Sequence, residues 1–376
     1  MKIGFDAKRA LNNSTGLGNY ARVLLNALAH YFPEEEYLLY TPMVNTEYSE
    51  LLDDKLALHL PDRTSRFNRG SIWRTFGLAT EVLKDRVDLF HGLSNELPYG
   101  INKSGAASVV TIHDLIFLKH SKQYPFLDRS IYTLKTKYAA KHADKIVAVS
   151  HETKHDLMEF YSVPEKKIEV IHPAVDELFY QEATKEQKAG VAKKYNLPQK
   201  YILTVGSFFP RKNQKVILEA FAALAAQAEE DLVMVGNSGT ERQNTEEAIA
   251  RLGLRNRVKI IDAVSNVDLP VVYQQSSLCV NASLWEGFGM PVLEGLCSNV
   301  PVLASDIASH KEAGGTAARY FKASDKEDLH QLMRRVLTDA NLKRDMIAQG
   351  RTQAEAMSSK LCAEKMMGLY RQLIRR

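Results

Sequence analysis

Residues 278–294 have the sequence LCVNASLWEGFGMPVLE, which predicts a short buried strand, a turn and a helix. The apolar run at 278–282 is bounded by serines, as is typical of a buried strand. Gly287 and Gly289 permit a sharp turn or the close approach of a ligand, because they have no Cβ. Pro291 suits the first turn of a helix, where its missing N–H costs nothing. Such a unit is typical of parallel α/β proteins.

Two glutamates flank this turn, Glu286 before it and Glu294 on the helix. The start of a helix favours an anion, here above the backbone of Gly287, Phe288, Gly289 and Met290. Eight helical residues rise about 12 Å, so the carboxylates are predicted to bracket an extended ligand rather than share one atom. A sugar joined through a diphosphate to a ribose has this shape. The alternative is an ordinary α/β corner with solvated glutamates.

The bulk properties are those of a soluble globular enzyme. The 376 residues give room for two domains, and 45% are hydrophobic and 25% charged. No apolar run approaches the roughly 18 residues of a spanning helix, and the start, MKIGFDAKRA, predicts a strand rather than a signal peptide. Three cysteines without metal spacing fit a reducing interior. A net charge of +4 is too small to indicate nucleic-acid binding.

Two basic segments carry aromatic residues. Residues 63–86 hold six basic residues against two acidic ones, and residues 119–145 have the same character. Each segment is compatible with contact to an anionic membrane, or with a helix that has a core side and a solvated basic side. The aromatic residues of the second segment suit either an acceptor groove or the core.

Apolar runs alternate with helical patterns in both halves, which predicts parallel α/β architecture. In the first half we expect strands at 2–7, 36–41, 87–92, 107–114, 145–150 and 168–173. In the second half we expect them at 201–207, 231–237, 258–263, 277–283 and 300–306. Each half is therefore predicted to form a doubly wound, Rossmann-like unit that binds ligands beyond the carboxyl ends of its strands.

The alternation of strands and helices is interrupted between Pro173 and Pro198, where residues 181–195 form a charged stretch that favours a helix. We therefore place the domain boundary near Asp176. The predicted domains are residues 1–176 and 177–357. The tail, residues 358–376, is amphipathic, with apolar residues at helical spacing and Lys and Arg opposite.

Polar residues or glycines follow other predicted strands. Arg211 and Lys212 suit a diphosphate, because one offers a fork of donors and the other a compact charge. His113 ends a strand and can donate a hydrogen bond to a sugar hydroxyl. Gly16 lies in a loop before a helix whose first amides suit a phosphate. A nicotinamide dinucleotide is disfavoured there, because Ala21 replaces the third glycine of its fingerprint. The alternative for each is an ordinary turn.

The segment WEGFGMPVLEGLCSNVPVLASD, residues 285–306, resembles the donor-site signature of retaining glycosyltransferases of family four. The resemblance extends over most of the chain and is strongest in its second half. It implies the GT-B fold, in which two Rossmann-like domains face each other across a cleft and the last helix crosses back to the first domain. It also implies that Glu286 contacts the donor sugar and Glu294 the nucleotide ribose, and that residues 1–176 bind the acceptor.

The resemblance assigns roles to four further residues. His113 matches a histidine near the anomeric carbon, and Gly16 matches a glycine loop that faces the donor phosphate and the acceptor. Gly236 matches a position that borders the nucleotide, and the backbone near Val264 matches a segment that meets the base.

One position departs from the family pattern. Many members have an arginine directly after the glycine that ends the strand, where this chain has Ser207. Either Arg211 supplies the guanidinium alone, or a variant donor geometry applies.

The resemblance implies a retaining hexosyltransferase that acts on a hydroxyl of a glycan or lipid-linked acceptor. The motifs FHG (90–92), PRKN (210–213) and EGFGMP (286–291) favour mannosyltransferase-like members that use GDP-mannose for surface polysaccharide or lipopolysaccharide. A UDP-sugar is the alternative donor. Most of the family works without a metal, and no Asp-x-Asp pair stands in a plausible place, so we expect no metal and no cofactor.

We expect a cytoplasmic protein, either free or at the inner face of the cell membrane, whose partners are a nucleotide sugar and an acceptor. Two other functions remain open. A GT-B isomerase of the 2-epimerase type would consume the donor without an acceptor. A non-catalytic subunit would bind the nucleotide sugar without turnover.

Overall fold

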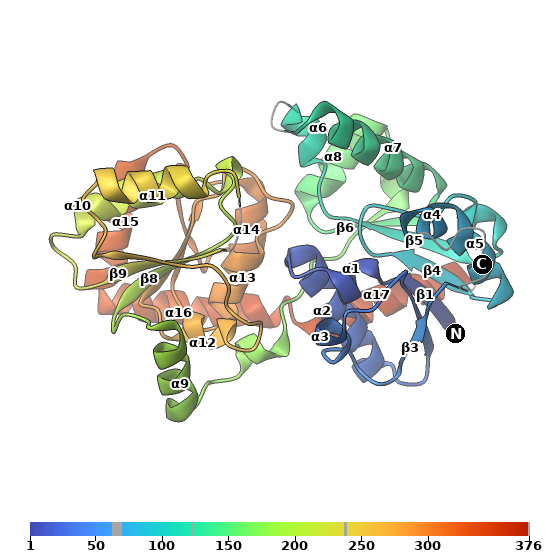
Figure 1. Cartoon of the computed structure of the whole chain (residues 1–376), viewed down its shortest axis with the longest axis horizontal. Coiled ribbons are helices and arrows are strands. Elements are labelled where there is room, and N and C mark those ends of the chain that lie inside the picture. The colour runs from blue at the N-terminus through green and yellow to red at the C-terminus, as the bar shows by residue number, and fades with distance from the viewer. Residues whose placement is uncertain (62–69, 122–123, 237–238, 375–376) are drawn as a thin grey trace. The chain divides into compact units, whose positions relative to one another are not determined.

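The structure is a computed structural model that describes residues 1–61, 70–121, 124–236 and 239–374. The chain divides into two compact units, Met1–Ala174 with Met357–Arg376, and Val175–Ala356. Each unit contains a parallel sheet with helices on both faces (Figure 1). The predicted architecture of two doubly wound, Rossmann-like units is thus confirmed.

Within the described residues, the sheet of the first unit has seven parallel strands in the order β3-β2-β1-β4-β5-β6-β7. Their bounds are β1 (Lys2–Asp6), β2 (Glu36–Tyr40), β3 (Leu56–His59), β4 (Leu89–Gly92), β5 (Ala107–Ile112), β6 (Lys145–Ala148) and β7 (Ile168–Val170). The chain reverses the direction of strand addition between β1 and β4, as in other doubly wound sheets. Strand β3 was not predicted. It is a short edge strand, and two of its four residues are exposed.

The helices of the first unit cover both faces of this sheet. They are α1 (Lys8–Asn12), α2 (Gly16–Tyr31), α3 (Thr46–Ser49), α4 (Gly70–Ile72), α5 (Leu78–Lys84), α6 (Ile116–Lys119), α7 (Phe126–His142), α8 (His151–Tyr161) and α17 (Ser359–Ile374). The last of these comes from the end of the chain and packs against α2, as the red helix among the blue elements of Figure 1 shows.

Helix α17 is part of the core of the first unit. Met366, Met367 and Tyr370 are buried in the same cluster as Phe5 of β1. The hydroxyl of Tyr370 also lies 2.6 Å from Nδ1 of the buried His91 in β4. The predicted return of the last helix to the first domain is therefore confirmed.

In the part of the second unit that is described, six parallel strands follow the order β10-β9-β8-β11-β12-β13. They are β8 (Tyr201–Val205), β9 (Asp231–Val235), β10 (Val258–Ile261), β11 (Leu278–Asn281), β12 (Val302–Ser305) and β13 (Arg319–Phe321). Its helices are α9 (Lys185–Tyr195), α10 (Gln214–Leu224), α11 (Arg242–Arg251), α12 (Leu269–Gln274), α13 (Met290–Cys297), α14 (Ala308–Gly314), α15 (Lys326–Thr338) and α16 (Ala340–Glu355). Strand β13 was not predicted, because it is a three-residue edge strand that begins with arginine.

The described part of the first basic segment forms helical turns with a core side, but one of its arginines is not solvated. Arg63, Arg66 and Arg69 lie outside the described residues. Arg74 is buried, and its guanidinium binds Asp6 at 2.6 Å and Glu96 at 2.8 Å. Its charge is therefore neutralised inside the first unit and is not available to a membrane. Among the described residues, no helix is both long and apolar enough to cross a membrane.

Candidate functional site

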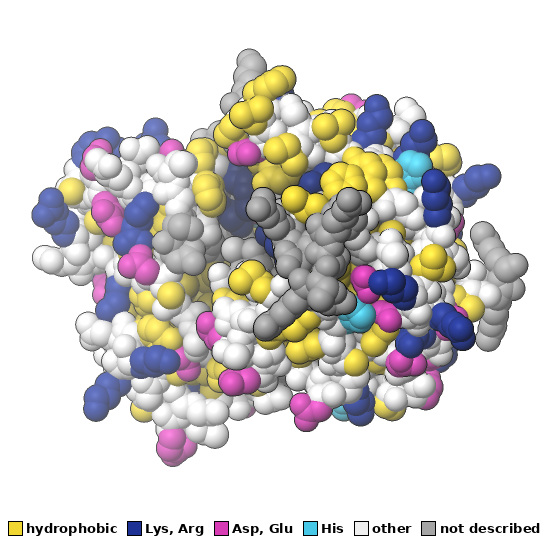
Figure 2. Space-filling model, turned by 45° about the vertical axis from the view of Figure 1, so that its right-hand side comes forward, with side chains coloured by type: hydrophobic (Ala, Val, Ile, Leu, Met, Phe, Trp, Pro, Cys, Tyr) yellow, Lys and Arg dark blue, Asp and Glu magenta, His cyan; other side chains and the backbone are white. Residues whose placement is uncertain are grey.

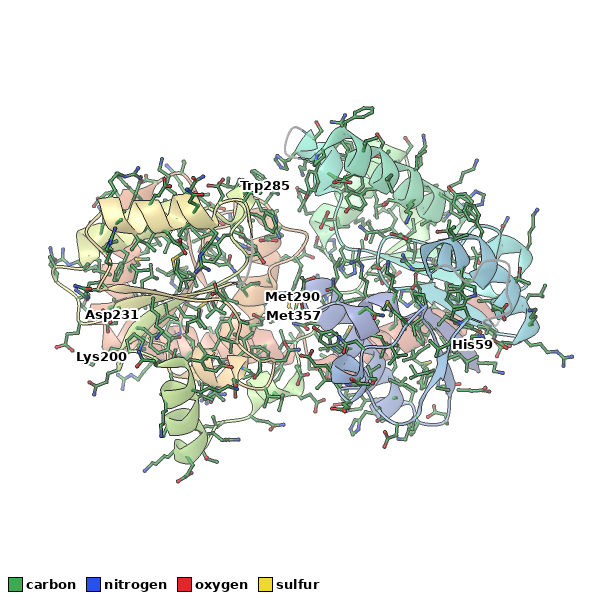
Figure 3. The ribbon with its side chains drawn as sticks, in the orientation of Figure 1. His59, Lys200, Asp231, Trp285, Met290 and Met357 are labelled. Carbon is green, nitrogen blue, oxygen red and sulfur yellow. The ribbon has the colours of Figure 1, made fainter. Side chains whose placement is uncertain are left out.

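The predicted donor-binding loops follow neighbouring strands of the second sheet. The loop after β8 carries Arg211 and Lys212, and the loop after β11 carries Glu286. Gly236 and Val264 follow β9 and β10. Because parallel strands end at the same edge of a sheet, all these loops start from one edge, on both sides of the point where the strand order reverses between β8 and β11. In Figure 3, Trp285 marks the loop between β11 and α13, and Met290 marks the first residue of α13.

The carboxylate of Glu286 binds both cations that were predicted to hold a diphosphate. Nη1 of Arg211 lies 2.5 Å from its Oε2, and Nζ of Lys212 lies 2.6 Å from its Oε1. The side chains of Lys212 and Glu286 are only 12% and 14% exposed. This cluster, Arg211, Lys212 and Glu286, is the centre of the candidate site.

The charges of the cluster shift one another's pKa values. Burial raises the pKa of Glu286, but attraction by Lys212 and Arg211 outweighs burial, so the net shift is strongly downward. Burial lowers the pKa of Lys212, and attraction by Glu286 does not fully offset it because Arg211 is nearby. The cluster thus places two cations around one carboxylate, and Glu294 also attracts Lys212. The clustered cations suit the binding of a diphosphate.

Backbone contacts hold the two loops of the cluster together. The amide of Leu284 donates to the carbonyl of Arg211 at 2.7 Å. Asn213, in the left-handed conformation at φ 54°, donates through its side chain to the carbonyl of Ala282 at 3.2 Å. Gly206 has φ 153°, and a Cβ there would lie 3.3 Å from Cε of Lys212. The glycine that ends β8 thus leaves room for the lysine side chain to lie against the backbone.

Glu294 has different surroundings. It lies on α13, where its Oε2 accepts a hydrogen bond of 2.7 Å from the hydroxyl of Tyr273. Burial raises the pKa of Glu294, partly offset by Tyr273 and Lys212. The separation of about 12 Å that was expected between Glu286 and Glu294 assumed that both lie on one helix. It does not apply, because α13 begins only at Met290 and Glu286 precedes it.

The loop between Glu286 and the helix is partly enclosed. The side chain of Phe288 is buried, so only its backbone is suited to a ligand. A Cβ on Gly289 would lie 3.0 Å from Cβ of Ala313 and 3.2 Å from Cδ2 of His310. Glycine is therefore needed where α13 starts against α14. The amides of Gly289 and Met290 stand at the helix start, where the helix itself provides no acceptor for them.

A hydrogen-bonded chain that sequence reasoning missed supports Glu286. The hydroxyl of Ser283 donates to Oε1 of Glu286 at 2.7 Å, and the hydroxyl of Ser305 donates to the carbonyl of Ser283 at 2.5 Å. Nδ1 of the buried His310 lies 3.0 Å from the Ser305 hydroxyl. Because that hydroxyl already donates its proton, the histidine must be the donor, with Nδ1 protonated. Burial lowers the pKa of His310 to about 4, so the ring is neutral at pH 7.

We expect His310→Leu to reduce kcat/KM for the donor sugar about five- to tenfold, the effect of one lost buried hydrogen bond, while nucleotide diphosphate affinity is unchanged. His310→Asn places an amide N–H near Nδ1 and should restore most of the activity. Steady-state kinetics with calorimetric titration test both variants. Equal losses in the two would show that His310 acts only by filling space.

Gly236 and Val264 lie at the same edge as the cluster but in other loops. A Cβ on Gly236 would lie 2.3 Å from the carbonyl oxygen of Gly206, so only glycine allows this approach of the β8 and β9 ends. Val264 is half-buried between β10 and α12. The next amide, that of Ser265, donates to the hydroxyl of Tyr195 at 3.2 Å, which fixes the loop.

His113 and Gly16 belong to the first unit. Nε2 of His113 lies 2.9 Å from the carbonyl oxygen of Leu93, so this nitrogen carries the proton and Nδ1 is an acceptor. Burial lowers the pKa of His113 to about 4. The side chain is thus suited to accept from a sugar hydroxyl, rather than to donate as its position first indicated. Gly16 begins α2 with open space around it, whereas a Cβ on Gly18 would lie 1.9 Å from the carbonyl oxygen of Asn13.

Comparisons with known proteins agree with this architecture. Residues 186–353 match the family model of glycosyl transferases group 1, and residues 15–177 match that of Glycosyltransferase Family 4. The chain is 26% identical over 297 residues to O-antigen chain mannosyltransferase B of Escherichia coli, covering 78% of this chain and 76% of that protein. It is 30% identical over 260 residues to the serotype-specific mannosyltransferase WbdA of Escherichia coli, covering 67% of this chain but only 32% of that longer protein.

The structure of Anabaena Alr3699/HepE in complex with UDP and glucose superposes with a TM-score of 0.76 and 16% identity, covering 99% of this chain and 100% of that one. The fold is therefore GT-B. Together with the two family models, this shows that the chain belongs to the GT-B glycosyltransferases of family four, and it is a glycosyltransferase.

Proposed function

We propose that the protein transfers mannose from GDP-mannose, with retention of configuration, to a hydroxyl of a glycan or lipid-linked acceptor in surface polysaccharide biosynthesis. The observation that carries this proposal is the half-buried cluster of two cations and one carboxylate at the carboxyl edge of the second sheet. The names of the similar mannosyltransferases support mannose as the sugar.

The proposed mechanism assigns each part of the cluster to one part of the donor. Arg211 and Lys212 stabilise the negative charge that develops on the departing β-phosphate, together with the amides at the start of α13. Glu286 accepts hydrogen bonds from the sugar hydroxyls, and Glu294 from the ribose. His113 accepts from a hydroxyl near the anomeric carbon, and the loop at Gly16 faces the phosphate.

The acceptor proton needs a base, and Glu286 is a poor one. Its lowered pKa means that the carboxylate holds a proton weakly. This supports a route in which the departing phosphate oxygen takes the proton from the acceptor hydroxyl on the same face of the sugar. The cationic side chains and helix-start amides take the place of a divalent ion, so we propose a metal-independent reaction at the inner face of the cell membrane.

The test is a donor screen in EDTA. GDP and GDP-mannose should raise the melting temperature more than UDP, ADP or their sugars. A ligand that binds only the folded state adds about 2.7 kcal/mol to the free energy of unfolding at a hundredfold excess over its Kd, so the nucleotide with the lowest Kd gives the largest shift. Transfer to an acceptor should proceed in EDTA. Turnover that requires Mg²⁺ or Mn²⁺ would refute metal independence, and loss of donor without an acceptor would indicate an isomerase instead.

A further inference from the structure

Helix α7 of the first unit exposes a continuous apolar surface. Phe126, Leu127, Ile131 and Leu134 have between 50% and 73% of their surface exposed. The opposite side of the helix is anchored by the buried Thr136, Ala139 and Ala140. Leu127, Ile131, Leu134 and Tyr138 follow one another at intervals of four, three and four residues, which places them on one outward stripe.

The same outward face becomes basic toward the end of the helix. Lys137 and Lys141 follow Leu134 at helical spacing, and both are exposed. In the described part of the chain neither forms an ion pair, in contrast to Lys135, which binds Glu96 at 3.1 Å. The only acidic residue within α7 is Asp128. The face thus joins an apolar half to a cationic half.

A row of stacked aromatic rings widens this surface. The exposed Phe76 and Tyr99 have ring centroids 5.4 Å apart, and Tyr99 lies 4.1 Å from Tyr138 of α7. Figure 2 shows hydrophobic side chains gathered in the upper part of the view, with basic side chains beside them. These rings extend the exposed apolar surface beyond α7, and aromatic side chains are common where a protein meets a membrane interface.

We infer that this surface, the α7 face (Phe76, Tyr99, Phe126, Leu127, Ile131, Leu134, Lys137 and Lys141), docks the protein on an anionic lipid bilayer. Apolar side chains on a helix enter the boundary between headgroups and acyl chains, and adjacent lysines bind anionic headgroups. A second copy of the chain is a poorer partner, because a two-fold pairing of this face would bury its lysines against the partner's apolar side chains or against each other. The inference deepens the proposed function by bringing the enzyme to a lipid-linked acceptor.

The experiment is flotation of the full chain with phosphatidylcholine vesicles that contain or lack phosphatidylglycerol, without nucleotide sugar. We expect binding only to the anionic vesicles, and weaker binding at high salt. Leu127→Ser with Leu134→Ser should lower the partition coefficient at least about tenfold. Lys137→Glu with Lys141→Glu should lower it by a similar factor and remove its salt dependence.

Matched controls separate docking from general charge or surface effects. Leu51→Ser with Leu58→Ser alters two exposed leucines near the other edge of the first sheet, and Lys185→Glu with Lys193→Glu reverses two exposed lysines on α9. Both controls should bind as the unmodified protein does.

Unchanged binding by both α7 variants would overturn the inference, as would sedimentation that shows a dimer broken by the leucine changes. Reduced affinity of the α7 variants for a short soluble glycan would instead assign the face to the acceptor. Vesicle binding is scored without catalysis, so its failure is distinct from failure of the donor screen.

Discussion

Lys212→Ala is expected to lower turnover about 100- to 1,000-fold while the protein stays folded. The ammonium is nearly buried and contacts Glu286 at 2.6 Å, in the cluster that we propose faces the leaving diphosphate. Losing one preorganised donor to a developing negative charge typically costs a factor of this size. Steady-state kinetics measure the change, and circular dichroism reports whether the fold is intact.

The chain offers a matched control three residues away. Lys215, on α10, is exposed, and its Nζ lies 3.9 Å from Oε1 of Glu219. Lys215→Ala removes the same charge and side chain from the same region and should leave turnover unchanged. Near-normal rates for Lys212→Ala would remove this lysine from the reaction. Equal losses in both variants would mean that the net charge of the region matters, rather than the position of Lys212.

The second large effect is a difference between the two glutamates. Glu286→Ala should abolish most transfer yet retain the affinity for the free nucleotide diphosphate, because it leaves Arg211 and Lys212 in place for the phosphates. Glu294→Ala should weaken nucleotide affinity by about 1–3 kcal/mol, the usual value of hydrogen bonds to a charged group. Calorimetric titration with GDP and a transfer assay measure both properties.

A third variant refines this comparison. Tyr273→Phe removes the hydroxyl that donates to Glu294 at 2.7 Å, and should cause part of the affinity loss of Glu294→Ala. Identical GDP affinities for both alanine variants and the unmodified protein would exclude Glu294 from the ribose site. Normal transfer by Glu286→Ala would exclude Glu286 from the sugar site.

The fold was predictable from the sequence where strands are central and apolar. Runs such as YILTV in β8 and ASVVTI in β5 stand out because both faces of a parallel sheet are covered. The edge strands β3 and β13 were missed, since they are only four and three residues long and edge positions tolerate exposed or charged residues. The exposed leucines of α7 were also unpredictable, because hydrophobic spacing does not tell a core face from a solvent face.

The site was predictable only at the level of loops. Glycines and charged residues after strand ends indicated Arg211, Lys212 and Glu286. Nothing in the sequence indicated that the carboxylate of Glu286 binds both Arg211 and Lys212. His310 lies shortly after the end of β12, and a polar residue that follows a strand in this way could have been predicted as a site residue. Tyr273 gave no such signal, since it lies on a helix 21 residues before Glu294.

The return of α17 to the first unit has a consequence for how the chain is made. The core around Phe5 contains Met366, Met367 and Tyr370, so it is incomplete until α17 leaves the ribosome. The whole second unit, Val175–Ala356, emerges in between. At usual elongation rates this delay is on the order of 10–40 s. The unit that is synthesised first is therefore finished last, and during that interval the surface of α2 that later receives α17 depends on chaperones or on its own solubility to avoid aggregation.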